Sequence, residues 1–443
     1  MRDEIVAAVK AAGVVGAGGA GFPTHVKINA TVHLVIANGA ECEPLLRAND
    51  HLMITESKKL IVGLKAVMLA TGAHEGMIAL KKKHVEAIRC LQQTLDEMKD
   101  REVTLSFLPD IYPAGDEQVL VHEVTGKIVP EGGIPLQVGV VVANVETLFN
   151  VANALEGQPV TEKFVTVAGA VRTPLTVKVP LGMKVEELIA LAGGATSYPF
   201  AVIDGGPMMG KLIDNDAAVT KTTGGILVLP ADHTIVVNKN VSWEATLHRA
   251  KAVCCNCLGC TEACPRHLLG HHIAPHRIMQ AIGRGQLSEV DVFSEAFLCS
   301  ECGVCDTYGC TMGLSPRKVN GYLKKQFAKA GIKNSHHHKP EHVQANRSYR
   351  LVPTQRLIAR LGILKYDVPA PLIIQNAVPR EVCLTLSGHI GAPAKPIVAV
   401  GEQVAKGDLI ATIPDGAAVG ANVHASITGT IFKSDSCICI RAV

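Results

Sequence analysis

The chain has 443 residues, a length that corresponds to two to four domains at roughly 100–200 residues per domain. Hydrophobic residues make up 48% of the chain and charged residues 19%, a balance that predicts a globular protein and excludes a disordered one. The formal net charge is only +3 and gives no argument for nucleic-acid binding.

The first third of the chain alternates between two periodicities. Helical spacing occurs at residues 3–9, 52–70 and 85–98, and buried-strand patterns occur at residues 33–37, 76–80, 103–107 and 138–142. Such alternation predicts an α/β domain with a parallel, Rossmann-like sheet covered by helices, although the order of the strands cannot be inferred from it.

A glycine-rich loop follows the first predicted helix, at residues 13–24. It contains a GxGxxG-like run but does not follow a clear strand, so it does not meet the structural context of the dinucleotide fingerprint. Its glycines would let the backbone approach a phosphate or an isoalloxazine ring closely, and its amides could donate hydrogen bonds. Taken alone, it could equally be a flexible loop.

The middle of the chain changes composition. Residues 161–230 are rich in β-branched residues, glycine and proline, with one helical piece at residues 185–190, which predicts a small α+β domain. Residues 336–338 are three consecutive histidines in a polar stretch, and we interpret them as part of a linker rather than a metal-binding tract.

Nine of the 14 cysteines lie between residues 254 and 310. One run has the spacing of bacterial ferredoxins, including the proline that follows it: Cys254-x2-Cys257-x2-Cys260-x3-Cys264-Pro265. A second run follows: Cys299-x2-Cys302-x2-Cys305-x4-Cys310. The x4 spacing and the absence of a following proline depart from the ferredoxin pattern.

In two-cluster ferredoxins the fourth cysteine of each run ligates the other cluster. We therefore predict one 4Fe–4S cluster on Cys254, Cys257, Cys260 and Cys310. The second would be held by Cys299, Cys302, Cys305 and Cys264. A pair of zinc sites is the alternative, but zinc needs only four ligands, which leaves the third cysteine of each run unexplained.

The remaining cysteines and nearby histidines are expected to be structural. Cys255 adjoins a ligand and would pack as a bystander, and His267, His271, His272 and His276 are expected to face solvent or support the ligands. Five scattered cysteines would be buried small apolar residues: Cys42, Cys90, Cys383, Cys437 and Cys439.

The C-terminal residues 381–443 again have strand-like patterns. Residues 401–411 and 423–431 look like the two halves of a lipoyl-like barrel-sandwich. The second half carries no lysine at a hairpin tip, so the sequence does not support a covalent lipoyl or biotinyl group.

Four segments occur in a fixed order: the glycine-rich loop, then residues 38–44, 114–117 and 143–148. Together they resemble the FMN- and NADH-binding subunit of respiratory complex I and its relative, the RnfC subunit of Rnf complexes. Residues 205–210 look like the soluble-ligand-binding β-grasp (SLBB) domain of that family, and residues 389–396 look like the RnfC barrel-sandwich, which stands at the N-terminus in RnfC. The permuted order, with ferredoxin runs between, is similar to the cobalamin reductases of propanediol-utilisation microcompartments.

The resemblance implies five segments along the chain. They are an FMN- and NADH-binding α/β domain at 1–158, a β-grasp domain at 159–240, a ferredoxin-like two-cluster helical domain at 241–335, a linker at 336–380, and a barrel-sandwich hybrid domain at 381–443.

The resemblance also implies a flavin site. FMN would pack against Gly16, Gly18, Gly19 and Gly21, with Lys27 near its phosphate or ring. Its hydrogen-bond partners would be Asn38, Glu41, Asp116, Glu117 and Asn144. Phe22 would stack on the nicotinamide dinucleotide, and Glu43 would meet its ribose hydroxyls. Complex I subunits carry an arginine, an aspartate and an asparagine where this chain has Ala17, Ala40 and Ala143, so the dinucleotide contacts are expected to differ.

The implied activity is an NADH-dependent cobalamin reductase that passes electrons from NADH through FMN and two 4Fe–4S clusters to a corrinoid, from cob(III)alamin towards cob(I)alamin. The alternatives are an RnfC-like electron-transfer subunit that delivers electrons to a partner redox protein without a corrinoid, and a docking module in which flavin chemistry is vestigial. We find no acid–base triad or nucleophile.

The implied partners are a corrinoid or a corrinoid adenosyltransferase as acceptor, and a microcompartment shell. No stretch reaches the about 18–20 apolar residues of a membrane helix, and residues 1–4 lack an apolar signal core. We therefore expect no membrane span, and a location in the cytoplasm or inside a bacterial microcompartment.

Overall fold

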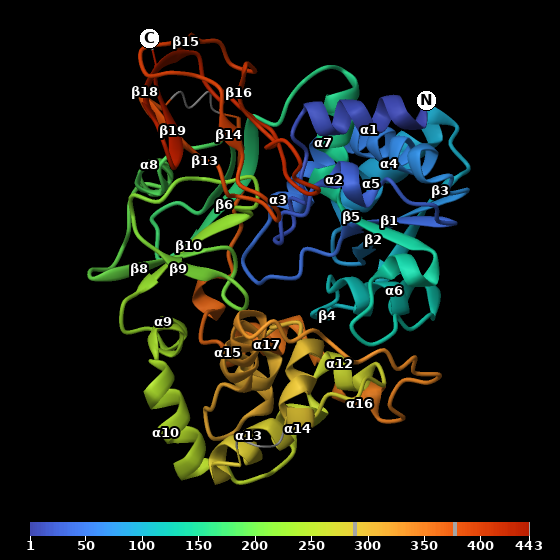
Figure 1. Ribbon diagram of the computed structural model, residues 1–443, viewed down its shortest axis with the longest axis vertical. Coiled ribbons are helices and arrows are strands. Elements are labelled where there is room, and N and C mark those ends of the chain that lie inside the picture. The colour runs from blue at the N-terminus through green and yellow to red at the C-terminus, as the bar shows by residue number, and fades with distance from the viewer. Residues whose placement is uncertain (287–289, 375–378, 443) are drawn as a thin grey trace.

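The computed structural model describes residues 1–286, 290–374 and 379–442. Figure 1 shows the N-terminal α/β domain beside the β-rich bodies of the middle and C-terminal segments, with a group of short helices below them. Within the described ranges, no helix is both long and apolar enough to cross a membrane.

The N-terminal domain is built on a four-stranded parallel sheet in the order β3-β2-β1-β5. The strands are β1 (Leu34–Gly39), β2 (Glu75–Lys81), β3 (Val103–Leu108) and β5 (Val140–Asn144). The two faces of β1 enter different cores: Val35 and Ala37 pack into one hydrophobic cluster, and Ile36 packs into another. A strand buried on both faces explains the continuous apolar pattern in the sequence.

Helices cover this sheet: α1 (Arg2–Ala11), α4 (Ser57–Thr71), α5 (Val85–Met98), α6 (Glu117–Thr125) and α7 (Val145–Leu155). The single helix expected at 52–70 is two helices, because Glu56 has a non-helical backbone between α3 (Ala48–Thr55) and α4. The strand expected at 138–142 begins at Val140, because Pro135–Val138 forms a 3-10 turn that Gly139 ends with φ +76°.

The β-grasp domain contributes most of a six-stranded sheet in the order β12-β7-β6-β10-β8-β9. Its strands include β6 (Glu162–Gly169), β7 (Leu175–Pro180), β8 (Phe200–Asp204), β9 (Lys211–Ile213) and β10 (Gly225–Pro230), and its helix is α8 (Val185–Leu191). The edge strand β12 (Leu372–Ile373) comes from the segment that was expected to be a linker.

The described residues of this segment, 336–374 and 379–380, form several short elements. Besides β12 it contains the short helix α16 (Arg347–Arg350), β11 (Val352–Pro353) and α17 (Thr354–Arg360). Strand β11 pairs with β4 (Ile111–Tyr112) of the N-terminal domain. The segment therefore fastens two domains together by adding short strands to each.

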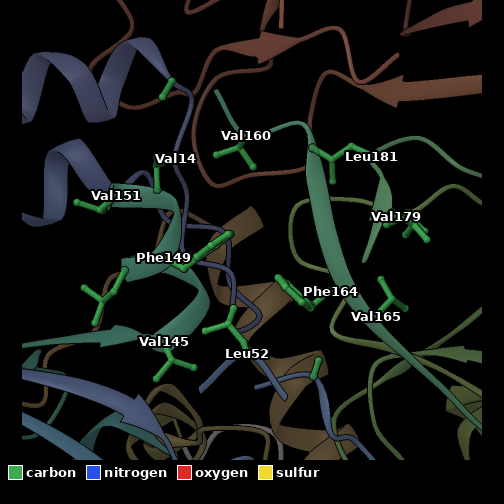
Figure 2. Close-up of a cluster of buried hydrophobic side chains, with 14 of the residues drawn as sticks. Val14, Leu52, Val145, Phe149, Val151, Val160, Phe164, Val165, Val179 and Leu181 are labelled. Carbon is green, nitrogen blue, oxygen red and sulfur yellow. The ribbon is translucent and has the colours of Figure 1, made fainter. Parts of the chain in front are cut away.

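A continuous hydrophobic core joins the N-terminal, β-grasp and C-terminal domains. At its centre, Phe149 of α7 meets Phe164 of β6 edge to face, with ring centroids 6.0 Å apart, and Leu52 and Val160 lie around them (Figure 2). Edge-to-face contact adds specific attraction to the burial of two large rings. These domains are therefore expected to move little relative to each other.

The cysteine-rich domain has a separate core. Its longer helices are α10 (Trp243–Val253), α13 (Pro275–Arg284) and α15 (Pro316–Lys329), and α9 (Thr234–Asn240) leads into it. Ile278 and Ile282 of α13 pack against Val319 and Phe327 of α15. The short helix α11 (Gly259–Glu262) lies within the first cysteine run, and the short helix α12 (Pro265–Leu268) follows it.

The C-terminal domain pairs two small sheets, as expected for a barrel-sandwich. Their orders are β13-β19-β18-β15 and β14-β16-β17, with β13 (Glu381–Thr385), β14 (Lys395–Pro396), β15 (Gln403–Val404), β16 (Leu409–Thr412), β17 (Val423–His424), β18 (Gly429–Ser434) and β19 (Cys437–Ala442).

The expectation that Cys383 and Cys439 are unpaired apolar residues is wrong. They form a disulfide, because the antiparallel register of β13 and β19 places them directly opposite each other. Pairing between residues 56 positions apart depends on this register, which the sequence does not reveal.

A half-buried lysine ties three of the domains together. Lys221 of the β-grasp domain donates hydrogen bonds to the carbonyl oxygens of Gly13 and Asn422, each at 2.7 Å. The first carbonyl belongs to the N-terminal domain and the second to the barrel-sandwich. Burial lowers the pKa of Lys221 to about 7.

This pKa predicts a pH-dependent stability. Between the folded value of about 7 and the ordinary value of 10.5, the unfolded chain binds a proton that the folded chain does not, so stability rises with pH. We expect the difference in Tm between the wild type and Lys221→Met to shift by a few degrees in favour of the wild type as the pH rises from 7 to 9. Thermal melts at several pH values measure this, with the exposed Lys329→Met as control, and Tm curves that stay parallel would contradict the prediction.

Candidate flavin and iron–sulfur site

The strand order creates a ligand-binding position at the carboxyl edge of the N-terminal sheet. The chain leaves β1 towards β2 on one side, while β5 lies on the other, so β1 and β5 meet at a topological switch point. Ligands of open α/β sheets bind outside the carboxyl ends of the strands at such a point. A cavity of about 1930 Å³ opens there, bounded by the N-terminal, β-grasp and cysteine-rich domains.

The glycine-rich loop forms one wall of this cavity. The amide of Gly16 donates to the carbonyl of Phe22 at 2.9 Å and closes the loop. Gly19 has φ +139° and Gly21 has φ +68°, conformations that L side chains rarely adopt. A Cβ on Gly18 would lie 3.2 Å from the Asn144 side chain. The loop thus leaves a shallow cradle that side chains would fill, which fits a flat ring such as a flavin.

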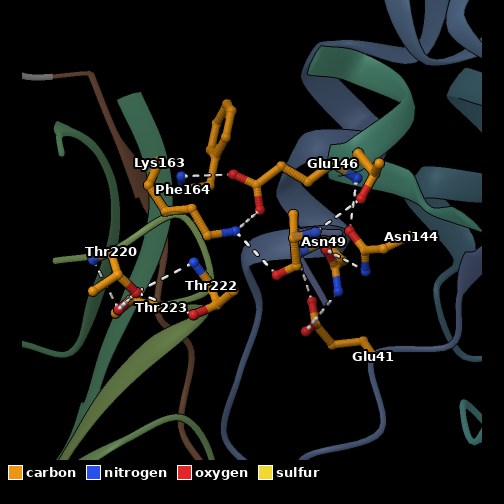
Figure 3. A network of polar contacts seen from close by, with 11 residues as sticks. Glu41, Asn49, Asn144, Glu146, Lys163, Phe164, Thr220, Thr222 and Thr223 are labelled. Carbon is orange, nitrogen blue, oxygen red and sulfur yellow. Dashed lines mark hydrogen bonds and ion pairs between the residues drawn. The ribbon is translucent and has the colours of Figure 1, made fainter. Parts of the chain in front are cut away.

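The expected polar residues gather at the ends of β1 and β5. Asn38 donates to the carbonyl of Gly115 at 2.9 Å, and Asn144 caps α7 by accepting from the Glu146 amide at 2.9 Å. The carboxylate of Glu41 accepts from the amides of Asn49 and Asp50 at 2.6 and 3.1 Å (Figure 3). Burial raises the pKa of Glu41, and these amides oppose the rise.

Three further expected residues lie on the cavity wall near α6. Lys27 makes an ion pair with Glu117 at 2.6 Å. One oxygen of Asp116 caps α6 through the amides of Gln118 and Val119, and the other accepts from the Arg266 guanidinium at 2.8 Å. Arg266 follows Cys264 and Pro265, so this pair links the flavin edge to the cysteine-rich domain.

The two residues expected to contact a dinucleotide have different surroundings. Phe22 is half-buried and lines the cavity at the end of the glycine loop. Both carboxylate oxygens of Glu43 accept hydrogen bonds from the β-grasp domain, from the amides of Met208 and Met209 at 2.9 and 2.8 Å. In this structure Glu43 thus joins two domains and its oxygens are already engaged.

Several residues at the site were not singled out from the sequence. Asn49 lies between Glu41 and Asn144, within 3.5 Å of the Asn144 amide. Buried Lys163 forms an ion pair with Glu146 and donates to the carbonyl of Ala17 at 3.4 Å (Figure 3). The Ala17 amide donates to Thr147 at 2.9 Å. In the sequence, the only sign of this network is that Glu146 stands two residues after Asn144.

The first predicted cysteine set is gathered around one small pocket. Cys254, Cys257, Cys260 and Cys310 all line it. Burial, together with negative charge on Cys310, Cys254 and Cys257, raises the pKa of Cys260 to about 12. Cys257 is exposed, so this set lies near the molecular surface.

The second predicted set is more deeply placed. Cys264, Cys302 and Cys305 are buried and Cys299 is half-buried. Burial, with a smaller contribution from Cys299, raises the pKa of Cys264 to about 12. Burial, Cys264 and Cys299 likewise raise the pKa of Cys302. Thiols that oppose each other's ionisation in this way fit a shared cationic iron–sulfur cluster.

The spacing of these cysteines does not fit a single bound ion. Among the described residues, no group of three or more histidine, cysteine or carboxylate side chains is arranged to hold one metal ion. A 4Fe–4S cluster needs a wider set, because each cysteine binds a different iron atom. Each of the two predicted sets supplies four cysteines, the number that one such cluster needs.

Each set contributes one residue to the cavity wall, Cys310 from the first set and Cys302 from the second. Cys302 lines the cavity, and its carbonyl accepts a hydrogen bond from the Tyr112 hydroxyl at 2.8 Å. Tyr112 precedes Pro113 to Glu117, the segment that carries two of the expected flavin residues. Cys42 lines the same cavity, and its sulfur accepts from the Gly115 amide at 2.6 Å, so it is not merely a packed apolar residue.

Four family models match the chain. They are the Nuo51 FMN-binding domain over residues 9–153, the SLBB domain over 164–212, the 4Fe-4S dicluster domain over 253–315 and the RnfC barrel sandwich hybrid domain over 367–440. The predicted fold class and cofactors, FMN and iron–sulfur clusters, are confirmed. This fold and site define a flavin and iron–sulfur oxidoreductase.

Relatives identify the family. The chain is 45% identical to cobalamin reductase PduS of Salmonella typhimurium over 97% of this chain and 94% of the relative, and 44% identical to PduS of Citrobacter freundii over 96% and 93%. An RnfC-type protein from the Na(+)-translocating ferredoxin:NAD(+) oxidoreductase complex of Acetobacterium woodii is 36% identical over 62% of this chain and 60% of its own length. The chain belongs to the PduS cobalamin reductase family.

A solved structure supports the fold alone. The NAD+-reducing [NiFe]-hydrogenase in its H2-reduced state matches with a TM-score of 0.51 and 21% identity, over 75% of this chain and 63% of that one.

Proposed function

We propose that this protein takes two electrons from NADH at its flavin site and delivers them singly, through two 4Fe–4S clusters, to a corrinoid. The observation that carries this proposal is the match to two cobalamin reductases over almost the whole chain, together with one cavity that borders both the glycine loop and Cys302. Bound FMN supplies the exchange between two-electron and one-electron chemistry, and the clusters supply the one-electron relay.

The residues of the cradle would hold the flavin rather than react with it. The loop glycines allow the backbone to approach the ring, with Asn38, Asn144 and the Asp116–Glu117 turn as hydrogen-bond partners and Lys27 as a cation for the phosphate. Glu41 and Asn49 hold each other in place behind Asn144. These polar side chains are half-buried and line the cavity.

The burial of the two cysteine sets gives the electron path a direction. The set Cys264, Cys299, Cys302 and Cys305 would receive electrons first, because Cys302 lies beside Tyr112 and the expected flavin residue Asp116. The set Cys254, Cys257, Cys260 and Cys310 lies near the surface and would receive them second. The balanced overall change is NADH plus two cob(III)alamin to NAD+, one proton and two cob(II)alamin, and a second NADH would carry both to cob(I)alamin.

Anaerobic oxidation of NADH with aquacobalamin as sole acceptor tests this function. We expect loss of absorbance at 340 nm, where reduced nicotinamide absorbs, with two cobalamin molecules reduced to the cob(II) state for each NADH. Omission of NADH or use of flavin-free protein should abolish the reaction. Rapid NADH oxidation with ferricyanide as acceptor, but none with aquacobalamin, would contradict only the transfer of electrons to a corrinoid.

That last outcome would favour the second candidate, an RnfC-like protein that passes electrons to a partner redox protein. The similarity to a component of a ferredoxin:NAD(+) oxidoreductase complex supports it. Copurification with a redox protein would then be expected. For the corrinoid function, we propose a corrinoid adenosyltransferase as a further partner and a location inside a microcompartment, on the strength of the PduS family.

A further inference from the structure

The cavity is too large for one ligand. Pockets for a single small molecule have volumes of about 300–1,000 Å³, and this one measures about 1930 Å³. Its flavin half is formed by the glycine loop and the ends of β1 and β5. The opposite half is formed by α9, α10 and α15, which extend below the β-grasp sheet in Figure 1.

We name this opposite half the cationic lobe. The residues that define it are Lys239, Trp243, Arg249, Lys318, Tyr322 and Lys325. Its most distinctive feature is an aromatic platform: Trp243, the chain's one tryptophan, stacks on Tyr322 with ring centroids 3.7 Å apart and planes 11° apart. Both rings are half-buried, so their outer surface can meet a flat ligand.

The cations of the lobe have no carboxylate in direct contact within the described residues. Among the described residues, none of its four cations takes part in an ion pair, and Lys239 and Lys318 donate only to backbone carbonyls. The nearby acids are engaged elsewhere, Glu301 with Lys324 at 2.9 Å and Asp306 with Ser315 and Arg317. Burial, followed by the charge of Arg317, lowers the pKa of Lys239 to about 8, and the charges of Glu43 and Asp306 offset only part of this effect.

The lobe also borders the iron–sulfur ligands. Cys310 and Cys302 line the cavity, one from each predicted cluster set. A ligand in the lobe would therefore lie beside a cluster, whereas the dinucleotide must meet the flavin at the opposite wall. The lobe has the position of an acceptor site.

From these features we propose that the cationic lobe binds the corrinoid acceptor, with the macrocycle over the Trp243–Tyr322 platform and the phosphodiester of its nucleotide tail at the cations of α10 and α15. This inference rests on the proposed function and adds a location to it. The cations would also favour electron arrival, because each electron lowers the charge of the bound corrinoid by one unit.

Equilibrium dialysis of anaerobically purified holoprotein with two neutral corrinoids tests the location. Cyanocobalamin carries the phosphodiester and dicyanocobinamide lacks it. We expect the double variant Arg249→Glu, Lys325→Glu to raise the Kd for cyanocobalamin on the order of tenfold, the sum of a few screened charge contacts, and to leave the Kd for dicyanocobinamide unchanged. Trp243→Ala should weaken both, and Trp243→Phe should restore most of the binding.

The matched control is Lys251→Glu, Lys329→Glu, which makes the same change of charge on the same two helices outside the cavity. It should leave both Kd values unchanged. The location would be overturned if the control weakened the binding of cyanocobalamin as much as the lobe variant. It would also be overturned if the lobe variant bound cyanocobalamin with the wild-type Kd. If the wild type still reduces aquacobalamin with NADH in that case, the proposed function stands without this site. FMN and iron contents confirm that each variant is loaded.

Discussion

A double variant with Cys254→Ser and Cys264→Ser is expected to lose both iron–sulfur clusters, although both substitutions lie in the same cysteine run. The crossed ligation assigns Cys254 to the surface set and Cys264 to the buried set, so each cluster loses one thiolate. The wild type should contain about eight irons and eight acid-labile sulfides per chain, as two 4Fe–4S clusters require. The double variant should fall towards zero after anaerobic purification, with no EPR signal on reduction by dithionite.

The companion variant distinguishes crossed from uncrossed ligation. Cys254→Ser with Cys310→Ser removes two ligands from one predicted cluster and none from the other, so about four irons should remain. If each run held its own cluster, Cys254→Ser with Cys264→Ser would retain about four irons, and Cys254→Ser with Cys310→Ser would lose both clusters. The control is Cys255→Ser, which alters the exposed neighbour of Cys254 and should retain the full iron content.

The cysteine sets could be predicted because their chemistry is local. Three thiolates separated by two residues must lie in one tight loop, and ferredoxin precedent supplies the fourth. The alternation of helix and strand likewise predicts a parallel sheet, because buried parallel strands have continuous apolar patterns. The order β3-β2-β1-β5 could not be predicted, since periodicity does not determine which strand pairs with which.

The contacts between domains could not be predicted either. Arg266 and Asp116 are 150 positions apart, and their ion pair depends on how the cysteine-rich domain docks on α6. Glu43 could be placed near the site, but its bonds to the Met208 and Met209 amides depend on the position of the β-grasp domain. Two-residue strands such as β11 and β12 show no periodicity, so the segment 336–380 resembled a linker.

Gly18→Val is expected to abolish FMN retention and to leave the iron content unchanged. A Cβ at residue 18 would already lie 3.2 Å from Cβ and Nδ2 of Asn144, a tight contact, and the two methyl groups of valine extend further into the cradle. Asn144 cannot easily retreat, because its side-chain oxygen caps α7. Gly18→Ala should retain an intermediate fraction, since a shift of a few tenths of an ångström relieves its contact.

The ratio of flavin to protein, from absorbance after anaerobic reconstitution, measures the effect. The clusters lie in another domain with its own core, so iron content reports correct folding in the same sample. Normal FMN content in Gly18→Val would mean that the flavin does not lie on this loop.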